Sequence, residues 1–199
     1  MKSAKTKVAG VSARWKCVRL LIGAAVGLSF VQAVPSAAQS SAIEFTVSGT
    51  STIRGWTCTV QGAAEVRPGA GAPAPGFDAG VQTATLSVPV NGFDCPEEEM
   101  REHLLEAMRA DEFADITFRL ESYEVAGQQA QATGSLTILD ATEPVIFPVS
   151  LSPSGGDVTI AGELRLDMTT YGVEPPVVML GLLRVRPQIT IQFEGSVSP

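Results

Sequence analysis

The only histidine of this 199-residue chain, His103, is the residue on which any serine–histidine–aspartate catalysis would depend. Such a triad needs an activated serine, and the sequence has no G-x-S-x-G turn that would present one. P-loop, G-x-G-x-x-G and H-E-x-x-H motifs are also absent from the sequence. We therefore expect a protein that is not an enzyme, has no catalytic residues and needs no cofactor.

Two groups of neighbouring carboxylates could, by residue type, act as paired acids or hold a cation. The glutamates at 97–99 are consecutive and point in different directions on a helix, so they fit a solvated helix start. Asp111, Glu112 and Asp115 lack the spacing of an EF-hand loop and fit a polar turn between a helix and a strand. These patterns predict no metal site.

Cys58 and Cys95 remain once Cys17, which lies in the N-terminal segment described next, is set aside. In an oxidising compartment an even pair is most simply a disulfide, and this one would close a loop of about 38 residues. Two free thiols or a redox pair are the alternatives. The wide separation of the two residues does not favour C-x-x-C chemistry.

The first 38 residues have the pattern of an export signal. Six lysines and arginines and no acid occur in residues 1–19, residues 20–31 are apolar, and small residues follow at 36–38. The apolar stretch is short for a membrane span. The pattern predicts a cleaved signal peptide over 1–38 and a periplasmic or secreted domain over 39–199, with a retained membrane anchor as the alternative.

The predicted domain is strongly acidic. Six of the 14 basic residues precede residue 39, which leaves eight, all arginine, against 21 acids and a net charge of −13. This charge argues against a nucleic-acid partner and against electrostatic docking to anionic lipid headgroups. With 45% apolar residues the chain can build one packed domain, and no stable membrane insertion is expected of it.

Apolar and polar residues alternate over many short stretches, which is typical of strands with one buried face in an antiparallel sheet. Strands of about eight to ten residues favour a closed barrel slightly over a two-sheet sandwich, because closure removes the edges. The pattern alone leaves both architectures open. The clear strand patterns lie at 83–90, 115–121, 145–151, 158–168 and 188–194, and weaker ones at 43–49, 52–60 and 130–139.

One segment, residues 96–110, is predicted to be a helix. Pro96 suits the first helical position, and the glutamates that follow it suit the positive end of the helix dipole. Its apolar stripe should cover a barrel end or a sheet face; it consists of Met100, Leu104, Ala107 and Met108. Residues 68–80, with three prolines and four glycines, predict a long loop that is either a mobile rim or a tolerated insertion.

A domain with dry inward rows and no reactive set of residues points to binding. A barrel of about eight strands is either filled by its own side chains or holds one small ligand. The residue pattern does not distinguish a filled core from a cavity, and it leaves open whether two copies form a homodimer.

Four segments carry a family pattern in the order GTSTIRGW (49–56), AMRADEFADITF (107–118), GSLTI followed by TEPV (134–145), and LDMTTYGVEPP followed by MLG (166–181). Together they resemble the YceI-like family of exported proteins. Arg54 and Gly55 stand where the family has His and Asp, and Ala114 stands where it commonly has Pro.

The resemblance implies a mainly β fold, an antiparallel lipocalin-like barrel of about eight strands with one or two short helices. It also implies a non-enzymatic protein that transports or sequesters a polyisoprenoid, a quinone tail or a fatty-acid derivative. The apolar segment 177–183 would flank a portal or touch a membrane surface, or else form a buried strand or loop. Candidate cavity-wall residues are Trp56, Leu86, Val88, Ile116, Phe118, Leu136, Ile138, Phe147, Leu164 and Leu166.

Overall fold

A computed structural model describes residues 39–199 of the chain, so the expected signal peptide and Cys17 lie outside the described residues. The strands are β1 (Gln39–Ser51), β2 (Gly55–Pro68), β3 (Val81–Pro89), β4 (Asp115–Ala126), β5 (Gln129–Ile138), β6 (Ala141–Ser154), β7 (Asp157–Asp167), β8 (Val177–Val178) and β9 (Leu183–Val197). One α-helix, α1 (Glu98–Ala107), and three 3₁₀ turns, η1 (Val90–Gly92), η2 (Met168–Tyr171) and η3 (Met179–Gly181), complete the set.

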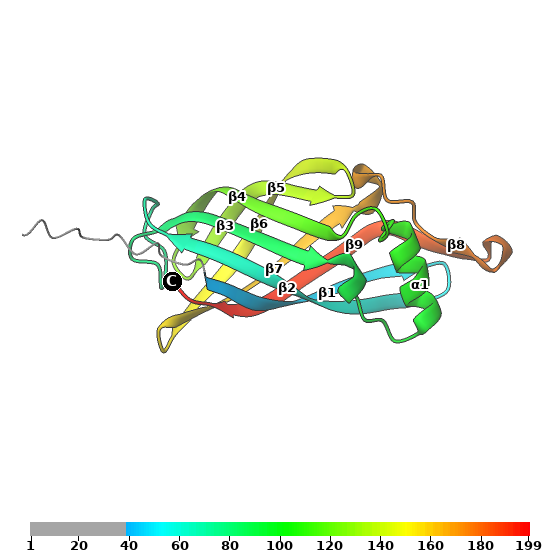
Figure 1. The fold of residues 1–199 in the computed structure, drawn as a ribbon, viewed down its shortest axis with the longest axis horizontal. Coiled ribbons are helices and arrows are strands. Elements are labelled where there is room, and N and C mark those ends of the chain that lie inside the picture. The colour runs from blue at the N-terminus through cyan, green and yellow to red at the C-terminus, as the bar shows by residue number, and fades with distance from the viewer. Residues whose placement is uncertain (1–38) are drawn as a thin grey trace, which may run out of the picture. The chain divides into compact units, whose positions relative to one another are not determined.

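Eight of the strands form a closed antiparallel barrel (Figure 1). Each strand from β1 to β6 pairs with the next, β7 pairs with β9, and β9 returns to β1. Ile43 in β1 shows the closure, because it lies opposite Gly62 of β2 on one side and Gly195 of β9 on the other. The predicted lipocalin-like barrel is confirmed, and the sandwich alternative is wrong.

Buried residues alternate with more exposed ones along the barrel strands, as β5 shows most clearly. Along β5 every second residue from Ala130 to Ile138 is buried while its neighbours are exposed or half-buried. The pattern is what a pleated strand gives when one face is dry. All eight strands predicted from periodicity exist, and the short β8, which pairs only with β9, was not predicted.

Four phenylalanine rings fill the middle of the barrel. Phe147 packs edge-on against Phe118 and Phe193, with ring centroids 5.2 and 5.8 Å apart, and Phe45 lies 6.1 Å from Phe193. The wall makes room for the rings with glycines, because a Cβ added at Gly62, Gly134 or Gly162 would collide with a phenylalanine ring. This part of the barrel is therefore a packed core.

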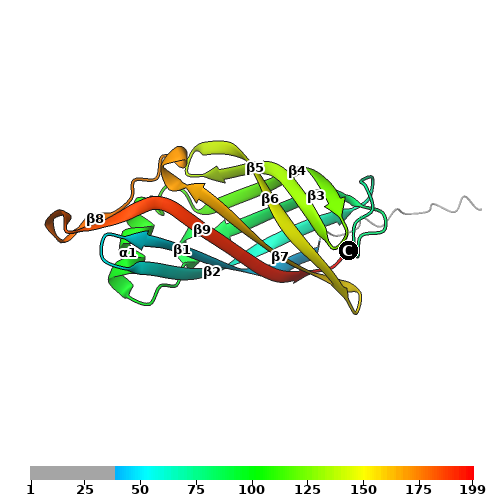
Figure 2. The ribbon, with the colours of Figure 1, turned by 180° about the vertical axis from the view of Figure 1, so that it is seen from behind.

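The end of the barrel opposite α1 is closed by the loop between β2 and β3 (Figure 2). Ala74 and Phe77 of this loop are buried and exchange two backbone hydrogen bonds of 3.1 and 2.8 Å. Tyr123 fastens the loop, because its hydroxyl donates to Ala72 O and accepts from the amide of Val81 at 2.8 Å. The loop therefore plugs this end, and the barrel opens at the other end only. Neither sequence interpretation of residues 68–80, a mobile rim or a tolerated insertion, anticipates such a plug.

Substituting Gly162 with alanine is expected to lower the free energy of unfolding by about 1–3 kcal/mol, the usual cost of overpacking. The new Cβ would meet the Phe193 ring and lie 2.8 Å from the carbonyl oxygen of Pro148, which cannot move aside. Urea unfolding of the purified protein measures the change. Gly55→Ala is the matched control, since its nearest neighbour would be 3.6 Å away. Equal stability of the two variants would contradict the prediction.

Candidate functional site

A pocket of about 380 Å³ lies at the barrel end that α1 covers. The inner faces of β1, β2 and β9 form its walls, and α1 and the segment after β7 complete it. Eighteen of its 23 lining residues are apolar, so an apolar ligand would leave few polar groups without water. The apolar wall residues from the three strands are Val47, Trp56, Cys58, Leu183, Val185, Ile189 and Ile191.

The polar lining residues gather where the pocket reaches the surface. Arg54, from the turn between β1 and β2, forms an ion pair of 2.9 Å with Glu97, which immediately precedes α1. Both side chains are about half exposed, so the pair adds little stability. Glu99, His103 and Ser51 are the other polar residues of the lining. We call this polar opening the mouth of the pocket.

Helix α1 acts as the cover because it is amphipathic. Its apolar stripe, predicted from the sequence, lies against the core and lines the pocket through Met100, Leu104 and Ala107, with Met108 just after the helix. The outward side carries Glu98, Glu102 and Glu106, all of them exposed, while Glu99 is exposed at the mouth. The helix begins two residues later than Pro96, since Glu97 is its N-cap and Pro96 precedes the cap.

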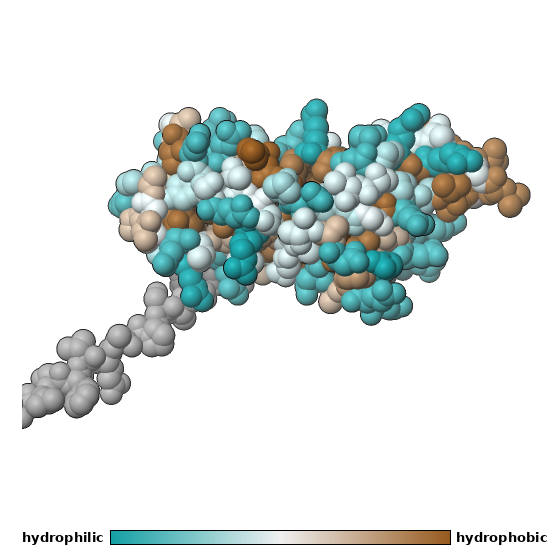
Figure 3. Space-filling view, turned by 90° about the horizontal axis from the view of Figure 1, so that it is seen from above, coloured by the Kyte–Doolittle hydropathy of each residue, from teal (hydrophilic) through white to brown (hydrophobic). Residues whose placement is uncertain are grey.

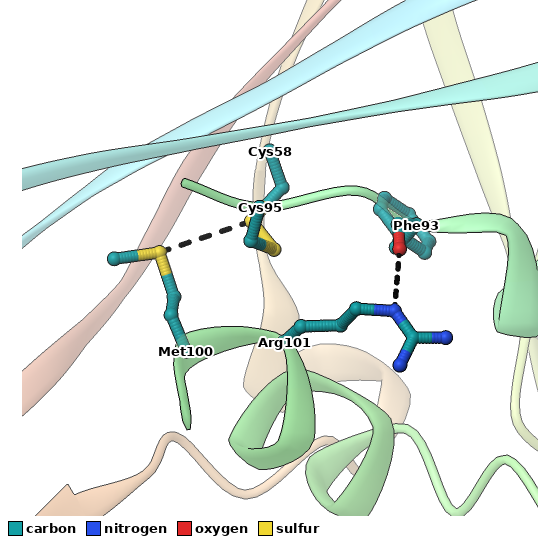
Figure 4. Close-up of a disulfide and its surroundings, with 5 residues drawn as sticks. All are labelled: Cys58, Phe93, Cys95, Met100 and Arg101. Atoms are coloured by element: carbon teal, nitrogen blue, oxygen red, sulfur yellow. Dashed lines mark hydrogen bonds between the residues drawn. A yellow bond between two sulfur atoms is a disulfide. The ribbon is translucent and has the colours of Figure 1, made fainter. Parts of the chain in front are cut away.

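A disulfide between Cys58 and Cys95 joins β2 to the segment that leads into α1 (Figure 4). Beside it, Thr59 and Asp94 exchange two backbone hydrogen bonds of 2.8 Å. Met100 packs against the bridge, with its Sδ atom 3.9 Å from Cys58 Sγ. The start of the cover is thus fixed to the barrel wall by covalent and backbone bonds.

Arg101 also fixes α1 to the segment that precedes it, through residues before Cys95. Its Nε atom donates to the carbonyl oxygen of Phe93 at 2.9 Å (Figure 4). A terminal nitrogen donates to Asn91 O at 3.2 Å. Phe93 is buried and lines the pocket. The guanidinium therefore links the exposed side of the helix to the floor of the pocket.

The turn η2, at the end of β7, forms a further part of the rim. Asp167 accepts hydrogen bonds from the hydroxyl and the amide of Thr169, and these bonds hold the pKa of its carboxyl below the ordinary value. Tyr171 is buried in this turn, and burial, together with the negative charge of Glu143, raises its pKa. Tyr171 therefore stays neutral at ordinary pH, and the ordered turn supports Met168 and Val173 in the lining.

The indole nitrogen of Trp56 is a buried donor for which the described part of the chain provides no acceptor. The ring lies over Gly49, where even a Cβ atom would come within 2.6 Å of it. Glycine at this position lets the indole lie flat on β1. An unpartnered buried N–H costs about 1–3 kcal/mol, so this donor lowers stability beside the pocket.

The structure divides the predicted wall residues between two places. Trp56, Ile116 and Ile138 line the pocket under α1. A gap of about 70 Å³ among the phenylalanine rings is lined by Leu86, Val88, Ile116, Phe118, Leu136, Phe147 and Leu164. Leu166 packs against the core and lines neither space. All ten residues lie on inward-facing rows of their strands. The seven that line the 70 Å³ gap face a space that the phenylalanine rings mostly fill.

Sequence reasoning missed most residues of the pocket, although two signals for them existed. The apolar stripe of α1 was recognised as a cover and was not named as wall. Ile189 and Ile191 alternate with polar residues in β9, yet only their strand was predicted. Met168 ends the alternating row at 158–168, so its inward direction was predicted although it was not named as wall. Val173 carried no periodic signal, because it lies in a turn after the strand.

The other groups with a potential for chemistry are dispersed. The glutamates of the helix start are exposed, and among residues 39–199 no three His, Cys, Asp or Glu side chains gather as a metal site would need. Arg109 lies over the ring of Phe113 and is 3.7 Å from both Glu112 and Asp140, which ties the turn after α1 together. Within the same described range, no helix has the length and hydropathy to cross a membrane.

Solved structures share this fold. BcnA of Burkholderia cenocepacia superposes with a TM-score of 0.63 at 20% identity, covering 77% of this chain and 96% of that chain. A polyisoprenoid-binding domain from Saccharophagus degradans gives 0.62 at 11% identity, with 82% and 100% covered. The YCEI protein of Campylobacter jejuni gives 0.55 at 12% identity, with 69% and 81% covered.

A comparison with curated protein sequences finds no match. The model of the YceI-like domain, in contrast, matches residues 33–197, which include every element of the barrel and the covering helix. The match agrees with the four sequence segments and with the shared fold. The chain belongs to the YceI-like domain family.

Proposed function

We propose that the protein holds one long apolar chain in the pocket under α1. The observation that carries this proposal is the pocket itself, about 380 Å³ of space with eighteen apolar lining residues at the open end of a closed barrel. Its polar residues lie at the mouth, where a ligand's polar end would meet water. A hydrocarbon tail inside and a polar end at the mouth match this division.

The pocket size sets how much of a ligand is enclosed. If one chain carbon needs about the volume of a water molecule, roughly 30 Å³, the pocket encloses about a dozen carbons. At about 0.8 kcal/mol per buried CH₂ this gives about 10 kcal/mol, from which the cost of association is subtracted. A longer tail extends through the mouth, because the far end of the barrel is plugged.

The description of one structural relative favours a polyisoprenoid chain over other amphiphiles. The Saccharophagus degradans structure with the same fold is described as a polyisoprenoid-binding domain. Transferred to this chain as a proposal, that description fits a pocket whose charged lining residues, Arg54, Glu97 and Glu99, are all exposed at the mouth. A fatty-acyl chain meets the same apolar wall and is the second ligand class to test.

The protein is proposed to carry or sequester this ligand outside the cytoplasm, without catalysis. The signal-like pattern of residues 1–38 and the Cys58–Cys95 disulfide support an oxidising compartment. The absence of a catalytic motif from the sequence supports a binding role. Cell fractionation that finds the protein in the cytoplasm would overturn the proposed location.

Extraction of the natively purified protein with organic solvent tests the proposed function. Mass spectrometry of the organic phase is expected to find a long-chain molecule at close to one per protein. Protein that is empty and also fails to bind an added medium-chain quinone in a fluorescence titration would overturn the proposal. This result would instead favour an interaction module that acts through its surface. The phenylalanine-filled middle of the barrel is compatible with that alternative.

A further inference from the structure

The hairpin formed by β8, η3 and the start of β9 projects from the barrel beyond α1 (Figures 1 and 2). Its exposed apolar residues are Val177, Leu180 and Leu182, and Ile53 lies in the neighbouring turn between β1 and β2. We call these four residues the apolar tip. The space-filling view shows the apolar tip as a cluster of hydrophobic residues, coloured brown, at one extremity of the molecule (Figure 3).

The apolar tip is more exposed than folding alone explains. Leu180 is fully exposed, Leu182 is 73% exposed and Ile53 is 62% exposed. Single exposed apolar residues are common, but clustered ones at the same extremity mark an interaction site. The sequence alternative of a buried strand or loop for residues 177–183 is wrong for these exposed side chains.

The apolar tip is held in place by the turn next to it. Thr52 donates from Oγ1 to Leu182 O at 2.8 Å and accepts from the Arg184 amide at 3.1 Å. Its own amide donates to Arg184 O at 3.0 Å. Leu180 has a left-handed backbone (φ 54°), an unfavourable conformation for leucine, and Gly181 continues the turn at φ 90°. The chain thus keeps a leucine at the outermost turn at a conformational cost.

Charges near the apolar tip favour a lipid surface. From residue 175 to residue 193 the chain has two arginines and no acid, although it is strongly acidic elsewhere. Arg184 and Arg186 are both exposed at the base of the hairpin, where headgroup phosphates would lie if the leucines entered the bilayer. Helix α1, which carries exposed glutamates, lies nearer the barrel than the hairpin does (Figure 1).

We propose that the apolar tip inserts into the interfacial layer of a phospholipid bilayer and places the pocket mouth at the membrane surface. Val178 and Leu183 of the same hairpin line the pocket, so the surface and the binding site are continuous. This inference rests on the proposed function in one respect: a water-insoluble chain has to be taken from a bilayer or delivered to one. Insertion is driven by apolar side chains, with the two arginines assisting through phosphate contacts.

A second copy of the chain fits the apolar tip less well. Stable dimers bury about 800 Å² on each partner, whereas the tip consists of four side chains on a narrow projection. Extending the contact area would bring the glutamates of two α1 helices together. The bilayer needs no such extended matching surface.

A tryptophan reporter tests the insertion directly. Leu182→Trp in the exported protein, from which the predicted signal peptide has been removed, is expected to show blue-shifted emission that brominated phosphatidylcholine vesicles quench. Ile146→Trp is the matched control, because Ile146 is 61% exposed but lies on the barrel wall in β6 and should show neither change. Comparison of the two variants removes the background of the native tryptophans.

A second pair of variants measures the contribution of the tip. Leu180→Asp together with Leu182→Asp is expected to weaken vesicle binding at least tenfold in cosedimentation, while Ile146→Asp leaves it unchanged. The tip variant should still take up a quinone supplied from detergent micelles, because neither leucine lines the pocket. This uptake separates loss of docking from loss of ligand binding.

Two outcomes would overturn the bilayer proposal. In the first, Leu182→Trp and Ile146→Trp respond equally to the brominated vesicles. In the second, the protein self-associates without vesicles and the double aspartate variant abolishes the association, which assigns the tip to a protein interface. A protein that docks normally but binds no ligand from any source would instead overturn the proposed function and leave the docking surface intact.

Discussion

Replacing Ala107 with tryptophan is expected to weaken binding of an apolar chain at least a hundredfold while the barrel stays folded. Ala107 is the last residue of α1 and lines the pocket from the cover side. An indole at this position would occupy much of the 380 Å³ that the ligand tail needs. A hundredfold loss corresponds to about 2.7 kcal/mol, which is about the transfer free energy of three to four buried methylene groups.

Glu106→Trp is the matched control for this substitution. It adds the same ring one position earlier, where the side chain is exposed and does not line the pocket. Titration with a fluorescent long-chain probe should give wild-type affinity for Glu106→Trp and a large loss for Ala107→Trp, at similar thermal stability. Equal affinity of the two variants would place the ligand outside the pocket under α1.

Periodicity predicted the barrel well because each strand has one dry face. The alternation in β3, β4 and β9 is visible in the sequence, and the structure buries the faces that the alternation identifies. The helix was predicted for the same reason, since the stripe from Met100 to Met108 has helical spacing. These features are local, so residues a few positions apart contain the whole signal.

The position of the pocket could not be predicted from such local signals. Leu86 and Ile189 are both inward-facing, yet Leu86 borders the ring-filled middle and Ile189 borders the pocket. The difference comes from where Phe118, Phe147 and Phe193 meet across the barrel, which depends on three strands distant in sequence. The two-residue period of a strand determines which side chains point into the barrel. Whether space remains beside them depends on which side chains meet once the barrel has closed.

Closure of one barrel end limits the routes by which the proposed ligand could enter, and the sequence pattern did not indicate this closure. Phe77 and its loop block the end opposite α1, so a ligand would enter and leave by the mouth near Arg54. The apolar tip lies at the mouth end of the barrel, on the hairpin that contributes Leu183 to the pocket lining. A single opening beside an apolar projection suits exchange with a membrane better than passage through the barrel.

Removing the disulfide by the double substitution Cys58→Ser and Cys95→Ser is expected to lower the free energy of unfolding by about 4 kcal/mol. The two cysteines are 37 positions apart, and a cross-link that closes a loop of this length restricts the unfolded chain by about that amount. In the folded state the backbone bonds between Thr59 and Asp94 remain. The variant should therefore fold, with a less stable cover.

Urea unfolding with and without a reducing agent measures this effect and contains its own control. Reductant should lower the stability of the wild type to that of the double variant and leave the double variant unchanged. Hydrogen exchange should show faster opening of α1 in the variant than in the wild type, while β5, which the bridge does not join to another segment, keeps its relative protection. If the double variant were as stable as the oxidised wild type, the bridge would not constrain the unfolded chain, and fastening of α1 would depend on Arg101 and the Thr59–Asp94 pair alone.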